Sequence, residues 1–149
     1  ADEMLDAALQ AAADAHIFIA TAAVADYKAA NVEQQKIKSK QHSLTLHLEK
    51  NPDILSTVAT THSHLYVVGF AAESQDLQTY AKDKLIRKKL DAIVANDISR
   101  SDIGFNNDEN EVHWIDGDGS ILFEKKSKSQ LAAELIEKIA SAQHEQIAP

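Results

Sequence analysis

An acid and a group of lysines near one short apolar run are the side chains best suited to chemistry. The run His16–Val24 is followed by Asp26, and Lys36, Lys38 and Lys40 alternate in the loop after it. Alternating residues of an extended segment share one face, and a bound anion relieves the repulsion between three cations. This pattern predicts a nucleotide or phosphate-ester site in which Asp26 accepts from an amino or hydroxyl group. For the lysines alone, a solvated mobile loop is the alternative interpretation.

Small residues at the end of the same run would let a ligand approach the backbone closely. Ala20, Thr21 and Ala22 stand near the end of this run, and open α/β sheets bind ligands at the carboxyl ends of their strands. Tight packing of the strand against a helix, with Asp26 as a turn or helix cap, is the structural alternative.

Two further segments could bind phosphates. Residues Asn51–Ile54 predict the start of a helix, with the asparagine as N-cap and the proline at the first helical position. A helix amino terminus binds anions through its free N–H groups. Lys84 and Lys88 share one face of a later helix, with Arg87 beside them, and could clamp a triphosphate. Simple capping and an exposed basic face are the respective alternatives.

Residues at two other strand ends would join the same edge of the sheet. Phe70 ends the apolar run Leu65–Phe70 and could stack on a base or ribose, although a core position is the alternative. Asn96 and Asp97 end the next apolar run. Because parallel strands end at one edge, we expect these groups to converge, and this convergence is stronger support for a site than any single motif.

The elements that must position these residues alternate between helix and strand. Apolar periodicity and turn residues predict strands at His16–Val24, Ser43–Leu48, Leu65–Phe70 and Asp91–Asn96, a hairpin of Glu111–Ile115 with Ser120–Glu124, and helices at Met4–Ala15, Asn51–Thr61, Asp76–Lys89 and Ser129–Ser141. The alternation predicts one α/β domain over residues 1–149, with three layers, a mainly parallel sheet of Rossmann-like or ribokinase-like type and an antiparallel hairpin. Residues 25–40 and 99–110 are expected to be loops, and the tail after Gln143 is expected to fray.

Composition narrows the classes of function. The 149 residues, 44% hydrophobic and 26% charged, suffice for one globular domain with a core. The formal net charge of -8 argues against nucleic-acid binding. No apolar run reaches membrane-spanning length, so we expect no membrane partner and a cytoplasmic protein. The chain lacks cysteine, which excludes a disulfide framework and a Cys-based zinc site. No Gly-x-Gly-x-x-Gly run follows a strand, which argues against a nicotinamide-dependent oxidoreductase.

Taken in order, the motifs resemble bacterial phosphopantothenoylcysteine synthetase. This enzyme is the ligase half of the bifunctional coenzyme A biosynthesis protein, whose other half is a flavin-dependent decarboxylase. The resemblance covers nearly the whole chain, and the ordered set is specific although no single segment is decisive. The segments that carry it are Ala22–Lys28, Lys36–Lys38, Lys50–Ile54, Val68–Glu73, Lys84–Lys88, Ala95–Asp97 and Gly104–Asn106.

The resemblance implies a CTP-dependent ligase. CTP would activate the carboxylate of 4′-phosphopantothenate as an acyl-cytidylate with loss of pyrophosphate, and the amine of cysteine would then form the amide. Lys36 would be the catalytic lysine of a flexible loop, and Asp26 would recognise the cytosine or ribose side of CTP. The implied CTP-binding residues are Ala20, Thr21, Ala22, Asp26, Lys36, Pro52, Asp53, Ile54, Leu55, Phe70, Lys84 and Lys88.

The resemblance also implies cofactors and partners. Mg²⁺ would accompany the phosphates, with no protein metal ligand assigned, and FMN would belong only to a fused or adjacent decarboxylase domain. A homodimer is implied, with the Ser43–Leu48 strand contributing to pairing. Family members begin with a Gly-Gly-Thr strand and an Asn/Ser/Gly-rich segment that this sequence lacks, so we expect an N-terminally truncated ligase domain. The alternative function is a non-catalytic nucleotide-binding or dimerisation module of the same protein.

Overall fold

Helices and strands alternate along most of the chain, as the apolar periodicity predicts. The computed structural model describes residues 1–37, 43–99, 102 and 107–147. The elements are α1 (Asp2–Ala12), β1 (Ile17–Ala20), β2 (Tyr27–Ala29), β3 (Leu48–Lys50), α2 (Ile54–Thr61), β4 (Tyr66–Glu73), α3 (Leu77–Lys88), β5 (Ala92–Asp97), β6 (Glu109–Asp116), β7 (Ser120–Ser127) and α4 (Lys128–Ile147).

Five strands form one mixed sheet in the order β1-β4-β5-β6-β7. Strands β1, β4 and β5 are parallel, whereas β6 and β7 extend the sheet as an antiparallel hairpin. The parallel strands β4 and β5 begin with continuous buried runs, because helices cover both of their faces. In the hairpin turn, Asp116 Oδ1 accepts from the N–H groups of Asp118 and Gly119, and Gly119 has a φ of 150° that disfavours other residues. The predicted α/β class and hairpin are confirmed.

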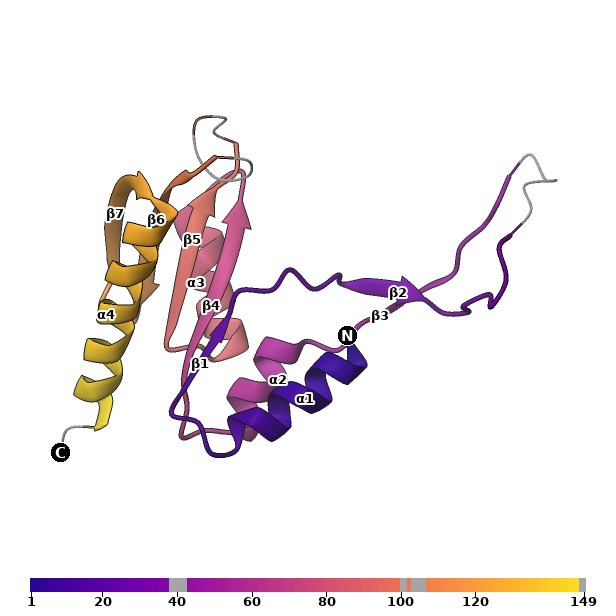
Figure 1. The fold of residues 1–149 in the computed structure, drawn as a ribbon, viewed down its shortest axis with the longest axis horizontal. Helices are drawn as coiled ribbons and strands as arrows, with labels where there is room; N and C mark the ends of the chain where they lie inside the picture. The colour runs from indigo at the N-terminus through magenta and orange to yellow at the C-terminus, as the bar shows by residue number, and fades with distance from the viewer. Residues whose placement is uncertain (38–42, 100–101, 103–106, 148–149) are drawn as a thin grey trace.

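Helices lie on both faces of the sheet, so the fold has three layers (Figure 1). On one face, α1, α2 and α3 pack against apolar side chains of β4 and β5, with Val58 and Ala81 fully buried. On the other face, α4 presents a stripe of Leu131, Leu135 and Ile139 at helical spacing. This stripe packs against a cluster that includes the fully buried Trp114 of β6.

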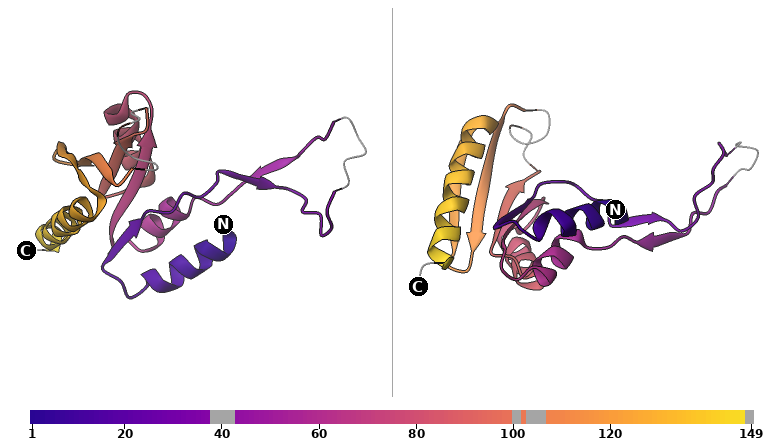
Figure 2. Two further views of the ribbon diagram at one scale, coloured as in Figure 1. Left: turned by 45° about the horizontal axis from the view of Figure 1, so that its top comes forward. Right: turned by 60° about the horizontal axis from the view of Figure 1, so that its bottom comes forward.

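The second sheet is a two-stranded ribbon that projects from the body of the molecule (Figures 1 and 2). Strands β2 and β3 pair antiparallel, with Tyr27 opposite Lys50 and Ala29 opposite Leu48. We call residues 27–37 and 43–50 the arm. Its large apolar side chains are exposed to solvent, which is unfavourable for an isolated chain. They are Tyr27, Val32, Ile37, Leu44, Leu46 and Leu48.

Several predicted strand boundaries are wrong for local reasons. The first strand ends at Ala20 instead of Val24, because β4 pairs only with Ile17–Ala20. The strand predicted at Ser43–Leu48 is β3, which begins only at Leu48, where the partner strand β2 begins to pair with it. The loop predicted over residues 25–40 therefore contains a short strand, and the loop predicted to reach Asn110 ends where β6 begins at Glu109.

Two helix ends also differ from the prediction. Helix α2 is capped by Asp53 and begins at Ile54, so Asn51 is not its N-cap and Pro52 is not its first helical residue. Helix α4 does not fray after Gln143 but continues to Ile147. Gln146 Nε2 donates to Asp91 Oδ1 over 3.0 Å, which ties the end of this helix to the start of β5.

Candidate functional site

A cavity of about 710 Å³ opens at the carboxyl ends of β1 and β4. A volume of this order, within about 300–1,000 Å³, is typical of small-molecule sites. Its walls come from the segment after β1, the segment that leads into α2, the end of β4 and the basic face of α3. Parallel strands end here and a helix begins here, so the cavity occupies the position where α/β sheets bind ligands.

The strand ends form the apolar wall of the cavity. Ala20 pairs with Gly69, and the residues that follow them, Thr21 and Phe70, both line the cavity. Phe70 is 38% exposed although it belongs to the sheet, so its ring is accessible from the cavity. A Cβ on Gly69 would come within 2.9 Å of Leu55 Cδ2, so glycine at this position lets α2 pack closely beside the cavity.

Asn51 braces the segment that carries Asp26. The Asn51 side-chain Nδ2 donates to the carbonyl oxygen of Ala25 over 2.8 Å, and the Asn51 backbone N–H donates to the carbonyl oxygen of Asp26 over 2.8 Å. The bridge uses Nδ2, whereas Oδ1 is buried without a hydrogen-bond partner among the described residues, and Asp53 caps α2 in place of Asn51. The Asp26 carboxylate itself accepts no hydrogen bond from any described residue. It is therefore available to a ligand in the cavity.

Asp53 connects the start of α2 to α3. Its Oδ1 accepts from the Ser56 N–H over 3.1 Å, and Lys88 Nζ lies 2.9 Å from its Oδ2. Burial alone would raise the pKa of Asp53, but the hydrogen bonds from Lys88 and from the Ser56 N–H hold the pKa below its ordinary value. The carboxylate thus stays ionised, and it holds Lys88 at the cavity wall.

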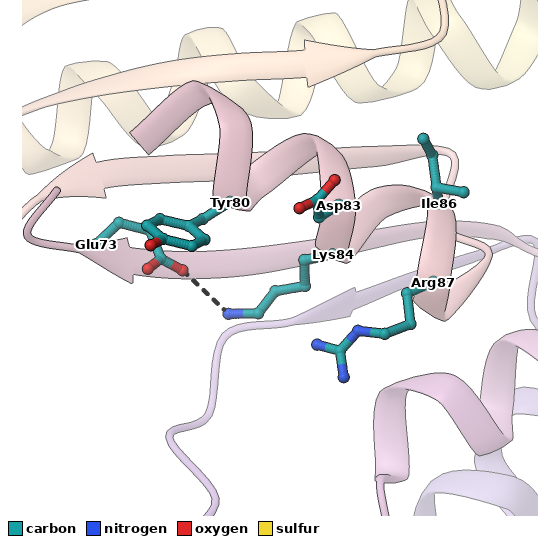
Figure 3. A pocket seen from close by; sticks show the side chains of 6 residues that line it. All are labelled: Glu73, Tyr80, Asp83, Lys84, Ile86 and Arg87. Carbon is teal, nitrogen blue, oxygen red and sulfur yellow. Dashed lines mark hydrogen bonds and ion pairs between the residues drawn. The ribbon is translucent and has the colours of Figure 1, made fainter. Parts of the chain in front are cut away.

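The other lysine on this face of α3 is held by the end of β4. Lys84 Nζ lies 3.3 Å from Glu73 Oε1. Lys84 and Glu73 line a second hollow of about 600 Å³ beside α3 (Figure 3). Lys84 and Arg87 line both hollows. The two hollows are therefore adjacent and share a cationic wall.

One cavity brings together all the residues predicted for nucleotide binding except Lys36. Those that line it are Ala20, Thr21, Ala22, Asp26, Pro52, Asp53, Ile54, Leu55, Phe70, Lys84 and Lys88. The reason is topological: β1 and β4 are adjacent parallel strands, and the helices that follow β3 and β4 pack on the same face. The geometric convergence is present, and the role of each residue in CTP binding stays a prediction.

Other predicted residues lie elsewhere. Lys36 is exposed on the arm and does not line the cavity, so its catalytic role stays a prediction. Lys38, Lys40 and the segment Gly104–Asn106 lie outside the described residues. Asn96 and Asp97 are at the end of β5, opposite Ala72 and Glu73, and line neither hollow because β4 lies between them and β1.

Some lining residues were not among the assigned CTP contacts. Lys50 lines the cavity and lies beside the predicted segment Asn51–Ile54. Arg87, predicted only as a neighbour of Lys84 and Lys88 in a possible triphosphate clamp, also lines the cavity. Met4 and Ala8 of α1 also line the cavity, but small and flexible apolar residues on a helix give no chemical signal.

Two general features of the described part of the chain bear on the class of site. Among residues 1–37, 43–99, 102 and 107–147, no three His, Cys, Asp or Glu side chains come together as a group that could hold a metal ion. None of the helices in this part is long and apolar enough to cross a lipid bilayer.

Known proteins resemble the chain over most of its length. Two curated relatives are coenzyme A biosynthesis bifunctional proteins CoaBC. The Haemophilus influenzae protein is 46% identical over 140 residues and the Bacillus subtilis protein 37% identical over 142 residues, matches that span 93% and 95% of this chain. The chain spans about a third, 35%, of the length of either relative.

Solved structures share the fold. The crystal structure of the C-terminal domain of CoaBC superposes with a TM-score of 0.77 and 30% identity, over 97% of this chain and 63% of that one. A Cab2 mutant in complex with phosphopantothenate-cysteine has a TM-score of 0.63 over 89% of this chain and 46% of that one, and at 16% identity this likeness shows the fold alone. The family described as DNA/pantothenate metabolism flavoprotein C-terminal domain matches residues 1–143. The resemblance drawn from the sequence is thereby confirmed, and the chain belongs to this family.

Proposed function

We propose that the cavity binds CTP and that the chain is the ligase part of a coenzyme A biosynthesis protein. The reaction would join 4′-phosphopantothenate to cysteine. The observation that carries this proposal is the cavity at the ends of β1 and β4. In it, a carboxylate that accepts no hydrogen bond from any described residue meets an exposed aromatic ring and a cationic helix face. Membership of the family supports the same conclusion.

Each wall of the cavity fits one part of CTP. Phe70 offers a ring on which cytosine stacks, and the Asp26 carboxylate accepts from the cytosine amino group or a ribose hydroxyl. Lys84 and Lys88 face the phosphates. The N–H groups of Ile54 and Leu55 at the start of α2 have no acceptor within the helix, so they add donors to the same wall.

Charge neutralisation is the main demand of the first reaction step. A carboxylate oxygen of 4′-phosphopantothenate attacks the α-phosphorus of CTP, and the bond from that phosphorus to pyrophosphate breaks. The cationic face of α3 stabilises the charge that gathers on the phosphate oxygens. In the second step the amine of cysteine attacks the acyl carbon, CMP leaves and the amine loses a proton.

Mg²⁺ fits this site as a companion of the nucleotide. The described residues provide no group of three metal-ligating side chains, but Mg²⁺ at nucleotide sites is held by one or two carboxylates together with substrate phosphates. Asp53, which lies beside Lys88 on the cavity wall, is the carboxylate that could complete its coordination. The ion would supply further neutralisation of phosphate charge.

The arm supports a proposal of dimerisation. Its exposed apolar residues, with Val32 83% and Leu46 63% accessible, would be covered by a second copy of the chain. Lys36 lies on the same arm, outside the cavity of its own chain. Its proposed catalytic role therefore requires either closure of the arm over the cavity or delivery of the lysine to the cavity of the partner.

A ligation assay tests the proposed function. The chain is incubated with CTP, Mg²⁺, 4′-phosphopantothenate and cysteine, and pyrophosphate and the amide product are quantified, with ATP in place of CTP in parallel. Formation of both products with CTP supports the ligase, and Lys36→Gln should abolish it while Lys82→Gln, a matched change on an exposed part of α3, should not. Failure to bind any nucleotide would refute the proposal.

A non-catalytic nucleotide-binding or dimerisation module is the second candidate, favoured by the exposed apolar arm. It predicts that the chain binds CTP or self-associates and yet releases no pyrophosphate in the same assay. The two candidates are therefore separated by product formation, whereas CTP binding is common to the ligase and to a nucleotide-binding module.

A further inference from the structure

The three cations on the cavity side of α3 differ in what they already contact. Lys84 lies 3.3 Å from Glu73, and Lys88 lies 2.9 Å from Asp53. Arg87 forms no hydrogen bond or ion pair with any described residue. Among the described residues, each of the two lysines is therefore in direct contact with a carboxylate, and the arginine is not.

This difference matters for an anion that carries several charges. A phosphate group that approaches Lys84 or Lys88 also approaches the carboxylate that holds it, so attraction and repulsion oppose each other. Arg87 interacts with the Asp53 carboxylate only through its charge, which lowers the pKa of Asp53, and no described carboxylate forms an ion pair with it. Lys50, on the opposite wall, also makes no ion pair with a described residue, but it belongs to the arm and not to the basic helix.

The position of Arg87 suits contact with a polyphosphate. It lies three residues after Lys84 and next to Lys88, and it lines both hollows. In Figure 3 the Lys84 and Arg87 side chains extend from α3 toward the segment after β1, whereas Ile86 and Asp83 point away from it. A guanidinium group donates two parallel hydrogen bonds to one phosphate, which an ammonium group does not.

We infer that Arg87 is a third phosphate-binding residue and the one that most favours a nucleoside triphosphate over a monophosphate. The inference rests on the proposed function, because it requires that the cavity binds CTP. The base and ribose are held at the strand ends, and the α-phosphate lies nearest to them. The distal phosphates then lie along α3, where Arg87 supplies the charge that the paired lysines lack.

The test compares the affinities for CTP and CMP by calorimetry in the presence of Mg²⁺. The variants are Arg87→Gln, Arg87→Lys and the matched control Lys82→Gln, which removes a charge from an exposed position of α3 that lines neither hollow. Losing a hydrogen bond between charged groups weakens binding by about tenfold or more. Arg87→Gln should therefore lower the affinity for CTP by at least about tenfold and leave that for CMP within about twofold.

The Arg87→Lys variant and the unmodified chain complete the test of the role of Arg87. Arg87→Lys should give an intermediate affinity, because the charge remains and the paired donors are lost. It also serves as the second variant if Arg87→Gln fails to fold, which a thermal unfolding curve would reveal. The inference is overturned if Arg87→Gln binds CTP as tightly as Lys82→Gln, or loses CTP and CMP equally. If the unmodified chain binds neither nucleotide, the proposed function fails as well, which is a distinguishable result.

Discussion

Replacement of Asp53 tests how the cavity wall is held together. Asp53→Ala removes the N-cap of α2, at a cost of about 1 kcal/mol. It also removes the ion pair with Lys88. In this pair the Asp53 side chain is 39% exposed and the Lys88 side chain is 19% exposed. Exposure of this degree limits the pair to about 0.5 kcal/mol. We expect a loss of about 1.5 kcal/mol in the free energy of unfolding, which corresponds to a fall of roughly 3–6 °C in Tm.

Asp53→Asn separates the two contributions. Asparagine caps helices about as well as aspartate, so this variant should lose only the ion pair, about 0.5 kcal/mol. Lys88→Met should cost a similar amount, and the double variant should cost no more than either single one. Urea denaturation at neutral pH measures all of these values.

The pH dependence of the free energy of unfolding is a second test of the role of Asp53. The pKa of Asp53 is held below its ordinary value of 3.8 in the folded state. The stability gained from the ionised carboxylate is therefore present above that value and is lost as the pH falls through the lower folded-state pKa. The difference between the unmodified chain and Asp53→Asn should close over this acidic range. The reasoning is refuted if Asp53→Asn costs as much as Asp53→Ala, or if the gap persists in acid.

Three further changes test other parts of the structure. Phe70→Ala should weaken CTP binding by about tenfold, because stacking on one base contributes about 1–3 kcal/mol, and an unchanged dissociation constant would remove Phe70 from the site. Gly69→Ala should lower the free energy of unfolding by about 1 kcal/mol, because its Cβ would crowd Leu55 and Leu90, and a neutral result in urea titration would show that both side chains move freely. Leu44→Glu with Leu46→Glu should shift the chain from dimer to monomer in sedimentation experiments, and a dimer that persists would exclude the arm as the interface.

The parts of the fold that the sequence predicts are those with strong local signals. The buried runs of β4 and β5 and the Asp116–Gly119 turn carry such signals, and the structure confirms them. The arm was not predicted as a ribbon, because β2 and β3 are only three residues each and their pairing joins segments far apart in the sequence. Short strands with distant partners leave little trace in local periodicity.

In the candidate site, too, some residues could be assigned from the sequence and others only from the structure. The lining residues at strand ends and on α3 follow from topology and helical spacing, so the sequence could assign them. The role of Asn51 could not be predicted, because its choice between capping α2 and bridging to Ala25 depends on how the segment after β1 folds back. The contacts of Asp53 with Lys88 and of Glu73 with Lys84 also depend on tertiary packing. Only the structure therefore distinguishes these lysines from Arg87, which forms no ion pair with a described residue.

Titration of CTP, with Mg²⁺, into the chain and into Asp26→Ala tests most directly whether this cavity recognises a pyrimidine nucleotide. Saturable binding by the unmodified chain should fall by about tenfold or more in the variant, because a hydrogen bond to an ionised carboxylate is lost. Asp14→Ala, which removes an exposed carboxylate that does not line the cavity, should bind as the unmodified chain does. Equal binding by all three proteins, or no binding by any, would contradict the assignment of the cavity.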